Sequence, residues 1–379
     1  LFRSNIILEK YPESKNKLEI TGNPRLSLLD NKFYLLEEEK VDEIKKEYSP
    51  FLLIVSNFSD INFIGIDFEK DKTEKLDSLL YYYEKFGLIK SKQDEEHYRE
   101  MFNYRNDILD KYFEIIEEIS KKYPELNIII RPHPSENSQG WKNLENNYNK
   151  NVKVIYEGNL SEWIKASELV MQNSCTSAIE SLLLNKSCIS YNPYEKAKFD
   201  QPLPNKLSIK INDSKEVLDI IEKIIREKNK NIFEKKYKEL REKAKENISY
   251  FESDESVEKI IKIIEKENLG HYNYNKLIYL LKHFFKGGLI KLGIIQLIAI
   301  SGISLYKLMK LFKLKNNKIY KYVKSRVEHY INIKRNEKQK IGTITKEEIE
   351  DLFHKFNKIY NNDIKVNISK IGKNSFIIQ

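Results

Sequence analysis

Short apolar runs alternate with amphipathic segments after Pro50, and this alternation predicts the main elements of the fold. Strands are expected at 51–55, 127–130, 152–156, 168–171 and 188–191. Apolar residues recur at helical spacing between the first two runs, at Ile108, Tyr112, Ile115, Ile116 and Ile119. Strands that alternate with helices are typical of a parallel sheet covered on both faces. The pattern therefore predicts an α/β fold with ligands bound outside the carboxyl ends of the strands.

Further helices are expected on either side of these strands. They are predicted at 176–184, 214–227 and 232–246, after Ser253, and in a short segment that Ser161 caps and that contains Trp163. Before the first strand, Gly22-Asn23-Pro24 is expected to break any regular element, because glycine and proline are the strongest local breakers. This run is interpreted as a linker or hinge.

The chain changes character in its C-terminal part, 251–379, which is predicted to be a mainly helical extension. Residues 287–305 are mostly apolar but are interrupted by Lys291 and Gln296. This segment fits a buried core helix or a basic helix on a membrane surface, and a membrane-spanning helix is the third alternative. A helix at 345–360 and a strand-like segment at 364–378 predict a small closing α/β unit.

Length, charge and cysteine usage narrow the class of protein. At 379 residues the chain is long enough for two or three modules. Its 66 Lys and Arg are offset by 57 Asp and Glu, so the charge of +9 does not indicate nucleic-acid binding. Cys175 and Cys188 provide neither a disulfide framework nor a zinc site, which favours the cytoplasm. Because the chain starts at Leu1, it is expected to be a fragment.

The first candidate for chemistry is the segment Arg131-Pro132-His133-Pro134. The prolines end the preceding strand and hold His133 at the carboxyl edge of the sheet, where its imidazole can donate to a phosphate or carboxylate oxygen. Arg131 adds a permanent positive charge that suits phosphate. A histidine after a strand is also compatible with a purely structural role.

The second candidate is the segment from Asn173 to Glu180, which follows a predicted strand directly. Its small residues, Ser174, Cys175, Thr176 and Ser177, expose backbone N–H groups at a strand-to-helix turn, which suits an anion. Glu180 lies about one turn into the helix, within reach of ribose hydroxyls if a phosphate occupies the turn. The alternative is an ordinary helix cap. Cys175 is not a nucleophile candidate, because no histidine is paired with it in the motif.

The two segments lie about forty residues apart, in an order that is more specific than either alone. Together with ITGNPR at 20–25, SNFSD at 56–60, YEGN at 156–159, SYNP at 190–193 and LPN at 203–205, they resemble bacterial surface carbohydrate biosynthesis proteins. Those proteins look like GT-B glycosyltransferases, related in outline to capsule-type enzymes that use CMP-activated ulosonic acids such as Kdo. One departure is Asn185-Lys186-Ser187, where related sequences commonly carry Gly-Lys-Pro.

The resemblance implies an organisation and a site. Residues 1–48 would be the end of an acceptor domain and a hinge, 49–250 a GT-B-like, Rossmann-type donor domain, and 251–379 the helical extension. The implied catalytic residue is His133, at the donor phosphate. The implied donor-binding residues are Arg131, Asn57, Ser174, Cys175, Thr176, Ser177 and Glu180, the last at the ribose.

The implied partners are a nucleotide-sugar donor and a glycan or lipid-linked acceptor, with peripheral contact to the inner membrane and no nucleic acid. The chemistry requires no metal and no cofactor. Two rival functions stay open: a phosphotransferase that uses CDP-activated polyols, and a non-catalytic membrane-associated scaffold. Four residues have two interpretations each: Asn57, Asp60 and Asp200 as donor contacts or turn formers, and Trp163 as a base-stacking or core residue.

Overall fold

The computed structural model describes the chain from residue 7 to residue 263, with gaps, and three segments near its C-terminus. The described residues are 7–62, 71–196, 198–229, 233–249, 256, 259–260, 262–263, 345–361, 368–372 and 375–378. The predicted apolar helix at 287–305 lies outside them. The helix predicted after Ser253 is described at 256, 259–260 and 262–263, which are helical.

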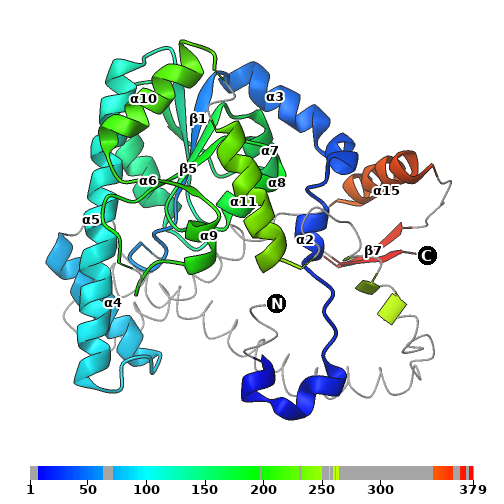
Figure 1. Ribbon diagram of the computed structural model, residues 1–379, viewed down its shortest axis with the longest axis horizontal. Helices are drawn as coiled ribbons and strands as arrows, with labels where there is room; N and C mark the ends of the chain where they lie inside the picture. Colours follow the sequence, from blue (N-terminus) through cyan, green and yellow to red (C-terminus); the bar gives the residue numbers. More distant parts are fainter. Residues whose placement is uncertain are drawn as a thin grey trace, which may run out of the picture. The chain divides into compact units, whose positions relative to one another are not determined.

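A six-stranded parallel sheet forms the centre of the fold (Figure 1). Its strand order is β3-β2-β1-β4-β5-β6. The strands are β1 (Phe51–Val55), β2 (Asn127–Arg131), β3 (Val152–Val154), β4 (Leu169–Gln172), β5 (Cys188–Tyr191) and β6 (Ile209–Ile211). This is the Rossmann-type order, so the predicted α/β class with a parallel sheet is confirmed. The third strand is shorter than predicted, and β6 was not predicted.

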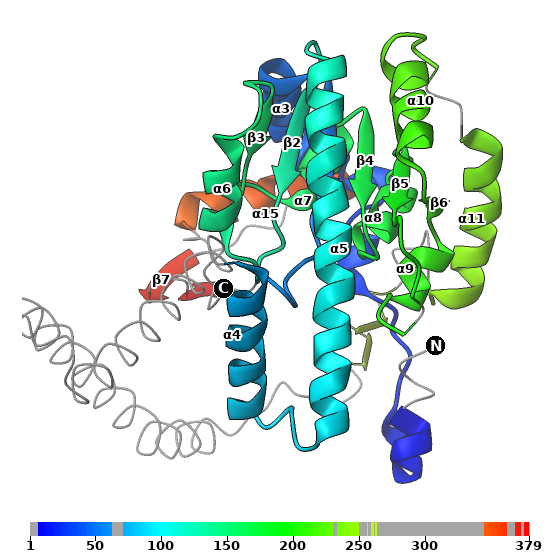
Figure 2. The same cartoon turned by 90° about the vertical axis from the view of Figure 1, so that its left-hand side faces the viewer.

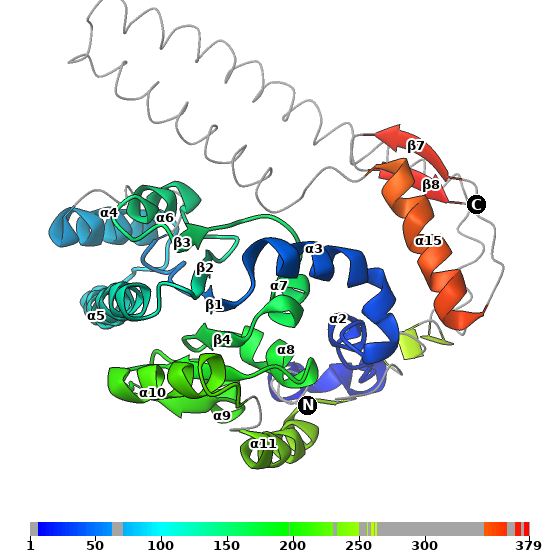
Figure 3. The ribbon, with the colours of Figure 1, turned by 90° about the horizontal axis from the view of Figure 1, so that it is seen from above.

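Helices cover both faces of the sheet, and the long helix α5 (Lys92–Lys122) crosses one face (Figure 2). With α10 (Ser214–Ile225) it packs on Leu52 and Ile54 of β1. The opposite face carries α3 (Glu38–Tyr48), α7 (Leu160–Ala166) and α8 (Ser177–Leu183), as Figure 3 shows. Because successive side chains of a strand point to opposite faces, the fully apolar run 51–55 supplies both cores.

The remaining helices lie before, between and after these elements along the chain. They are η1 (Pro12–Lys17), α2 (Pro24–Ser27), η2 (Asn31–Leu36), α4 (Lys72–Lys85), α6 (Ser138–Glu145), α9 (Pro202–Lys206), α11 (Glu234–Asn247) and α15 (Lys346–Tyr360). Gly22-Asn23-Pro24 was expected to break regular elements, and residues 18–23 have no regular secondary structure before α2 starts at Pro24. Asn23 caps α2 by accepting a hydrogen bond from the backbone of Arg25. Ser161 was predicted to cap α7, but the structure has Asn159 at the cap, in a capping box with Glu162.

The C-terminal elements match their prediction. Thr345 and Glu348 form a capping box for α15, and β7 (Ile368–Gly372) pairs with β8 (Ser375–Ile378) in an antiparallel hairpin. The described residues up to 256 and those from 345 onward belong to one compact unit. Within the described ranges, no helix combines the length and the apolar character that crossing a membrane requires.

Candidate functional site

The predicted site residues lie at or just beyond the carboxyl ends of β1, β2 and β4, with Arg131 in β2 and Ser177 and Glu180 in α8. The strand order reverses between β1 and β4, and a crevice at such a point is where open α/β sheets bind ligands. Asn57, after β1, bridges this point. Its side-chain nitrogen donates to the carbonyls of Asn173 and Ser174, at 3.2 and 3.1 Å. Asn57 therefore joins the loop after β1 to the loop after β4.

His133 follows β2 and is fixed through its backbone and its ring. Its backbone nitrogen lies 3.2 Å from Ser56 Oγ and 3.3 Å from Glu136 Oε1, and its carbonyl accepts a hydrogen bond from the Tyr156 hydroxyl. The ring atom Nδ1 accepts from the backbone nitrogen of Ser135 at 3.2 Å. Because Nδ1 acts as an acceptor, the proton of the neutral ring is on Nε2.

Glu136 connects the loops after β1 and β2, a role that the sequence did not reveal. Its carboxylate is fully buried and accepts hydrogen bonds from Ser56 Oγ and the Phe58 backbone nitrogen, both at 2.8 Å, and from Trp141 Nε1 at 2.6 Å. Burial raises the pKa of Glu136 to about 7, although these hydrogen bonds favour the charged form. The one sequence signal was an acidic residue three positions after His133.

Asp200 is at the centre of a polar network, not only in a turn. Its Oδ1 accepts from Tyr104 and Ser174 at 2.7 and 3.3 Å, and its Oδ2 accepts from Asn192 at 3.1 Å. Ser174 has a left-handed backbone, with φ of 48°, and also donates to Asn205 Oδ1 at 3.1 Å. Asp200 thus holds a strained residue of the predicted anion turn in place.

Asp60 also lies at this edge of the sheet, in an ion pair with Arg105. The two side chains are 2.9 Å apart, and Arg105 additionally donates to the Phe199 carbonyl at 3.0 Å. Asp60 Oδ1 and Arg105 Nη1 are buried and lack hydrogen-bond partners within the described part of the chain. The pair therefore has unused hydrogen-bonding capacity beside the crevice.

The predicted anion turn between β4 and α8 has one exposed hydroxyl, that of Thr176, whereas Ser174, Cys175 and Ser177 are buried. The Cys175 backbone nitrogen donates to Gln172 Oε1 at 2.6 Å. Burial raises the pKa of the Cys175 thiol, which keeps it uncharged.

Glu180 lies on α8 with its carboxylate almost fully buried. Its Oε1 is 2.9 Å from Nη2 of Arg25, a residue of α2. Burial raises the pKa of Glu180, and the charge of Arg25 opposes that effect. This contact joins the segment predicted as a hinge to the predicted ribose site.

Arg131 is bonded to the loop between β3 and α7, away from the other predicted donor residues. Its Nη1 donates to the Glu157 carbonyl and its Nη2 to the Gly158 carbonyl, the latter at 2.8 Å. Its guanidinium lies 5.3 Å from the centre of the Trp163 ring, and burial lowers the pKa of Arg131 to about 10. Trp163 in turn packs on Phe51, which supports the core interpretation of Trp163.

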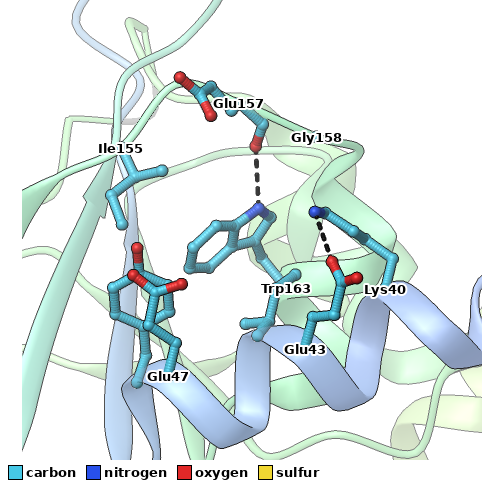
Figure 4. Close-up of a pocket in the computed structure, with 9 residues that line it drawn as sticks. Lys40, Glu43, Glu47, Ile155, Glu157, Gly158 and Trp163 are labelled. Atoms are coloured by element: carbon cyan, nitrogen blue, oxygen red, sulfur yellow. Dashed lines mark hydrogen bonds and ion pairs between the residues drawn. The ribbon is translucent and has the colours of Figure 1, made fainter.

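A pocket of about 340 Å³ lies beside Trp163 (Figure 4). Its lining residues are Lys40, Glu43, Ile44, Glu47, Tyr48, Ile155, Glu157, Gly158 and Trp163. Lys40 and Glu43 form an ion pair across 2.8 Å, and Trp163 Nε1 donates to the Glu157 carbonyl at 2.9 Å. None of the residues predicted to bind the donor lines this pocket.

No family model matches the chain, and no curated protein matches it in sequence. Among solved structures, it is similar to UDP-GlcNAc 2-epimerase of Methanocaldococcus jannaschii in complex with UDP-GlcNAc and UDP, at 17% identity and a TM-score of 0.39. It is also similar to UDP-GlcNAc 2-epimerase of Neisseria meningitidis bound to UDP-GlcNAc, at 15% identity and a TM-score of 0.34. Each similarity covers 70% of this chain and 58% of the other chain. The chain thus spans little more than half of either neighbour, and both likenesses are distant.

Proposed function

We propose that this chain carries the nucleotide-sugar site of a glycosyltransferase of bacterial surface-polysaccharide biosynthesis, with a CMP-linked sugar as the first donor to test. The observation that carries the proposal is the meeting of the loops after β1, β2 and β4 at one sheet edge. Asn57 joins the first loop to the third, and Glu136 joins the first to the second. The sequence segments with the predicted donor motifs are therefore bonded to one another at this edge of the sheet.

Each predicted residue has a defined task in this proposal. His133 donates from Nε2 to a donor phosphate, and Thr176 with the backbone of the turn completes the phosphate site. Glu180 accepts hydrogen bonds from the ribose. Neither end of the buried Asn173 side-chain amide has a partner among the described residues, so this amide can serve a polar ligand at the crevice. Arg131 is left out of this set because of its bonds to the β3–α7 loop.

The proposed reaction transfers the sugar to a glycan or lipid-linked acceptor at the cytoplasmic side of the inner membrane. Glycosyl transfer passes through a state with positive charge on the sugar and negative charge on the departing phosphate. His133 Nε2–H would stabilise that phosphate without a metal. In the rival phosphotransferase reaction the product contains a phosphodiester, whereas glycosyl transfer yields a glycosidic bond.

Thermal unfolding with CMP, CDP, UDP and GDP tests the proposal. A ligand at about one hundred times its Kd adds about 2.7 kcal/mol to the free energy of unfolding, which raises the Tm by several degrees. We expect one nucleotide to do this, less so for His133→Ala. The control is Arg99→Ala, which removes an exposed ion pair with Glu95 on α5. An unchanged Tm with every nucleotide would refute the proposal and favour the non-catalytic scaffold.

A further inference from the structure

The contact between Arg25 and Glu180 combines an exposed cation with a buried anion. The side chain of Arg25 is 69% exposed, whereas that of Glu180 is 6% exposed. Glu180 Oε1 is thus within reach of a donor that approaches from solvent, at 2.9 Å. Asn23 orients the start of α2 by accepting from the Arg25 backbone nitrogen at 3.1 Å.

A buried carboxylate needs a counter-charge to stay ionised, because desolvation penalises the charged form. The charged groups that act on Glu180 are Arg25, which stabilises its charge, and Glu37, which opposes it. Glu37 itself is bonded to Lys165 at 2.8 Å, and to Ser161 Oγ at 2.6 Å. Arg25 is therefore the cation that pairs directly with Glu180.

We propose that Arg25 is a positioning residue, which holds the Glu180 carboxylate charged and oriented so that Oε2 accepts a hydrogen bond from the ribose 2′-hydroxyl. This inference rests on the proposed function and adds a specificity to it: the site selects ribonucleotides over 2′-deoxyribonucleotides. Arg25 belongs to the segment before α3, so a residue outside the sheet and its helices determines how the nucleotide is selected.

Calorimetric titration with ribonucleotides and their 2′-deoxy counterparts tests this inference, with CMP, CDP, UDP, GDP and dCMP, dCDP, dUDP, dGDP as probes. We expect Arg25→Ala to weaken the ribonucleotide that binds about tenfold, the equivalent of one charge-assisted hydrogen bond, and to leave its 2′-deoxy form unchanged. We expect Arg25→Lys to lose less ribonucleotide affinity than Arg25→Ala. Arg99→Ala is the control for removing an exposed arginine.

Glu180→Gln separates a role through Glu180 from a general structural effect. In this background we expect Arg25→Ala to change affinity less than twofold, because Arg25 acts through the carboxylate that is missing. Equal loss for ribose and deoxyribose ligands, or the same loss in the Glu180→Gln background, would overturn the inference while leaving the nucleotide site intact. If no nucleotide binds the wild-type chain, it is the proposed function that fails.

Discussion

Replacing Glu136 by glutamine tests whether this buried carboxylate connects the loops that hold His133. The substitution keeps the size of the side chain and one carbonyl oxygen, but it removes the charge and the ability to titrate. In the wild-type chain, Ser56 Oγ, the Phe58 backbone and Trp141 Nε1 all donate to the carboxylate within 2.8 Å. Glutamine presents an NH₂ group in place of one acceptor, so at least one of these donors loses its partner.

The magnitude follows from the pKa of Glu136, which burial raises from 4.5 to about 7. The difference corresponds to about 3 kcal/mol between the folded and the unfolded chain. Because the folded state holds this proton more tightly, the contribution is fully present below about pH 4.5 and is lost as the pH rises through about 7. Glutamine does not titrate, so the wild-type chain loses about 3 kcal/mol relative to Glu136→Gln over this range.

The assay is chemical denaturation of both chains at several values from about pH 5 to about pH 8, with the difference in unfolding free energy plotted against pH. All other titrating groups are shared, so they cancel in this difference. The nucleotide affinity of Glu136→Gln is measured in parallel. It is expected to fall, because the hydrogen bond from the His133 backbone nitrogen to the Glu136 carboxylate is weakened. A difference that does not change with pH would refute the inferred burial of the titrating carboxylate.

Three further substitutions separate binding from stability. Asp200→Ala is expected to cost roughly 1 to 3 kcal/mol of unfolding free energy in chemical denaturation and to weaken nucleotide binding, because Tyr104, Asn192 and Ser174 each lose one acceptor; unchanged affinity would contradict the role of this network. His133→Ala should lower nucleotide affinity about tenfold in calorimetry with the unfolding free energy within about 0.5 kcal/mol, and a mainly structural His133 would show the reverse. Arg131→Met should destabilise by roughly 1 to 3 kcal/mol and leave affinity unchanged, because the Gly158 carbonyl loses the donor Arg131 Nη2; lost affinity at full stability would restore Arg131 to the donor site.

The central strands were predictable because each is a dense apolar run bounded by breakers. The first strand at 51–55 and the strand at 188–191 were predicted with the boundaries that the structure has. The strand Ile209–Ile211 escaped prediction because it is three residues long and includes the exposed Lys210. A pattern of period two cannot be recognised over so short a segment. The accuracy of a predicted helix start depended on choosing the right cap residue. Asn159 and Ser161 are both favoured cap residues, and the structure uses Asn159 where Ser161 was predicted.

The candidate site was predictable only as far as local motifs reach. His133 and the turn from Ser174 to Ser177 occupy the strand ends that their sequence neighbours predict. The partners of Arg131, Asp200 and Glu180 come from loops or helices that are distant in sequence, so no local pattern encodes them. The family resemblance, the domain boundaries and the membrane contact stay predictions.

Calorimetric titration of the chain with CMP, CDP, UDP and GDP, repeated with His133→Ala and Glu180→Ala, tests the nucleotide site most directly. We predict that one nucleotide binds selectively and that both substitutions weaken it, because His133 contacts the phosphate and Glu180 the ribose. Absence of binding by the folded wild-type chain would contradict the site at the edge of β1, β2 and β4. So would binding that neither substitution changes.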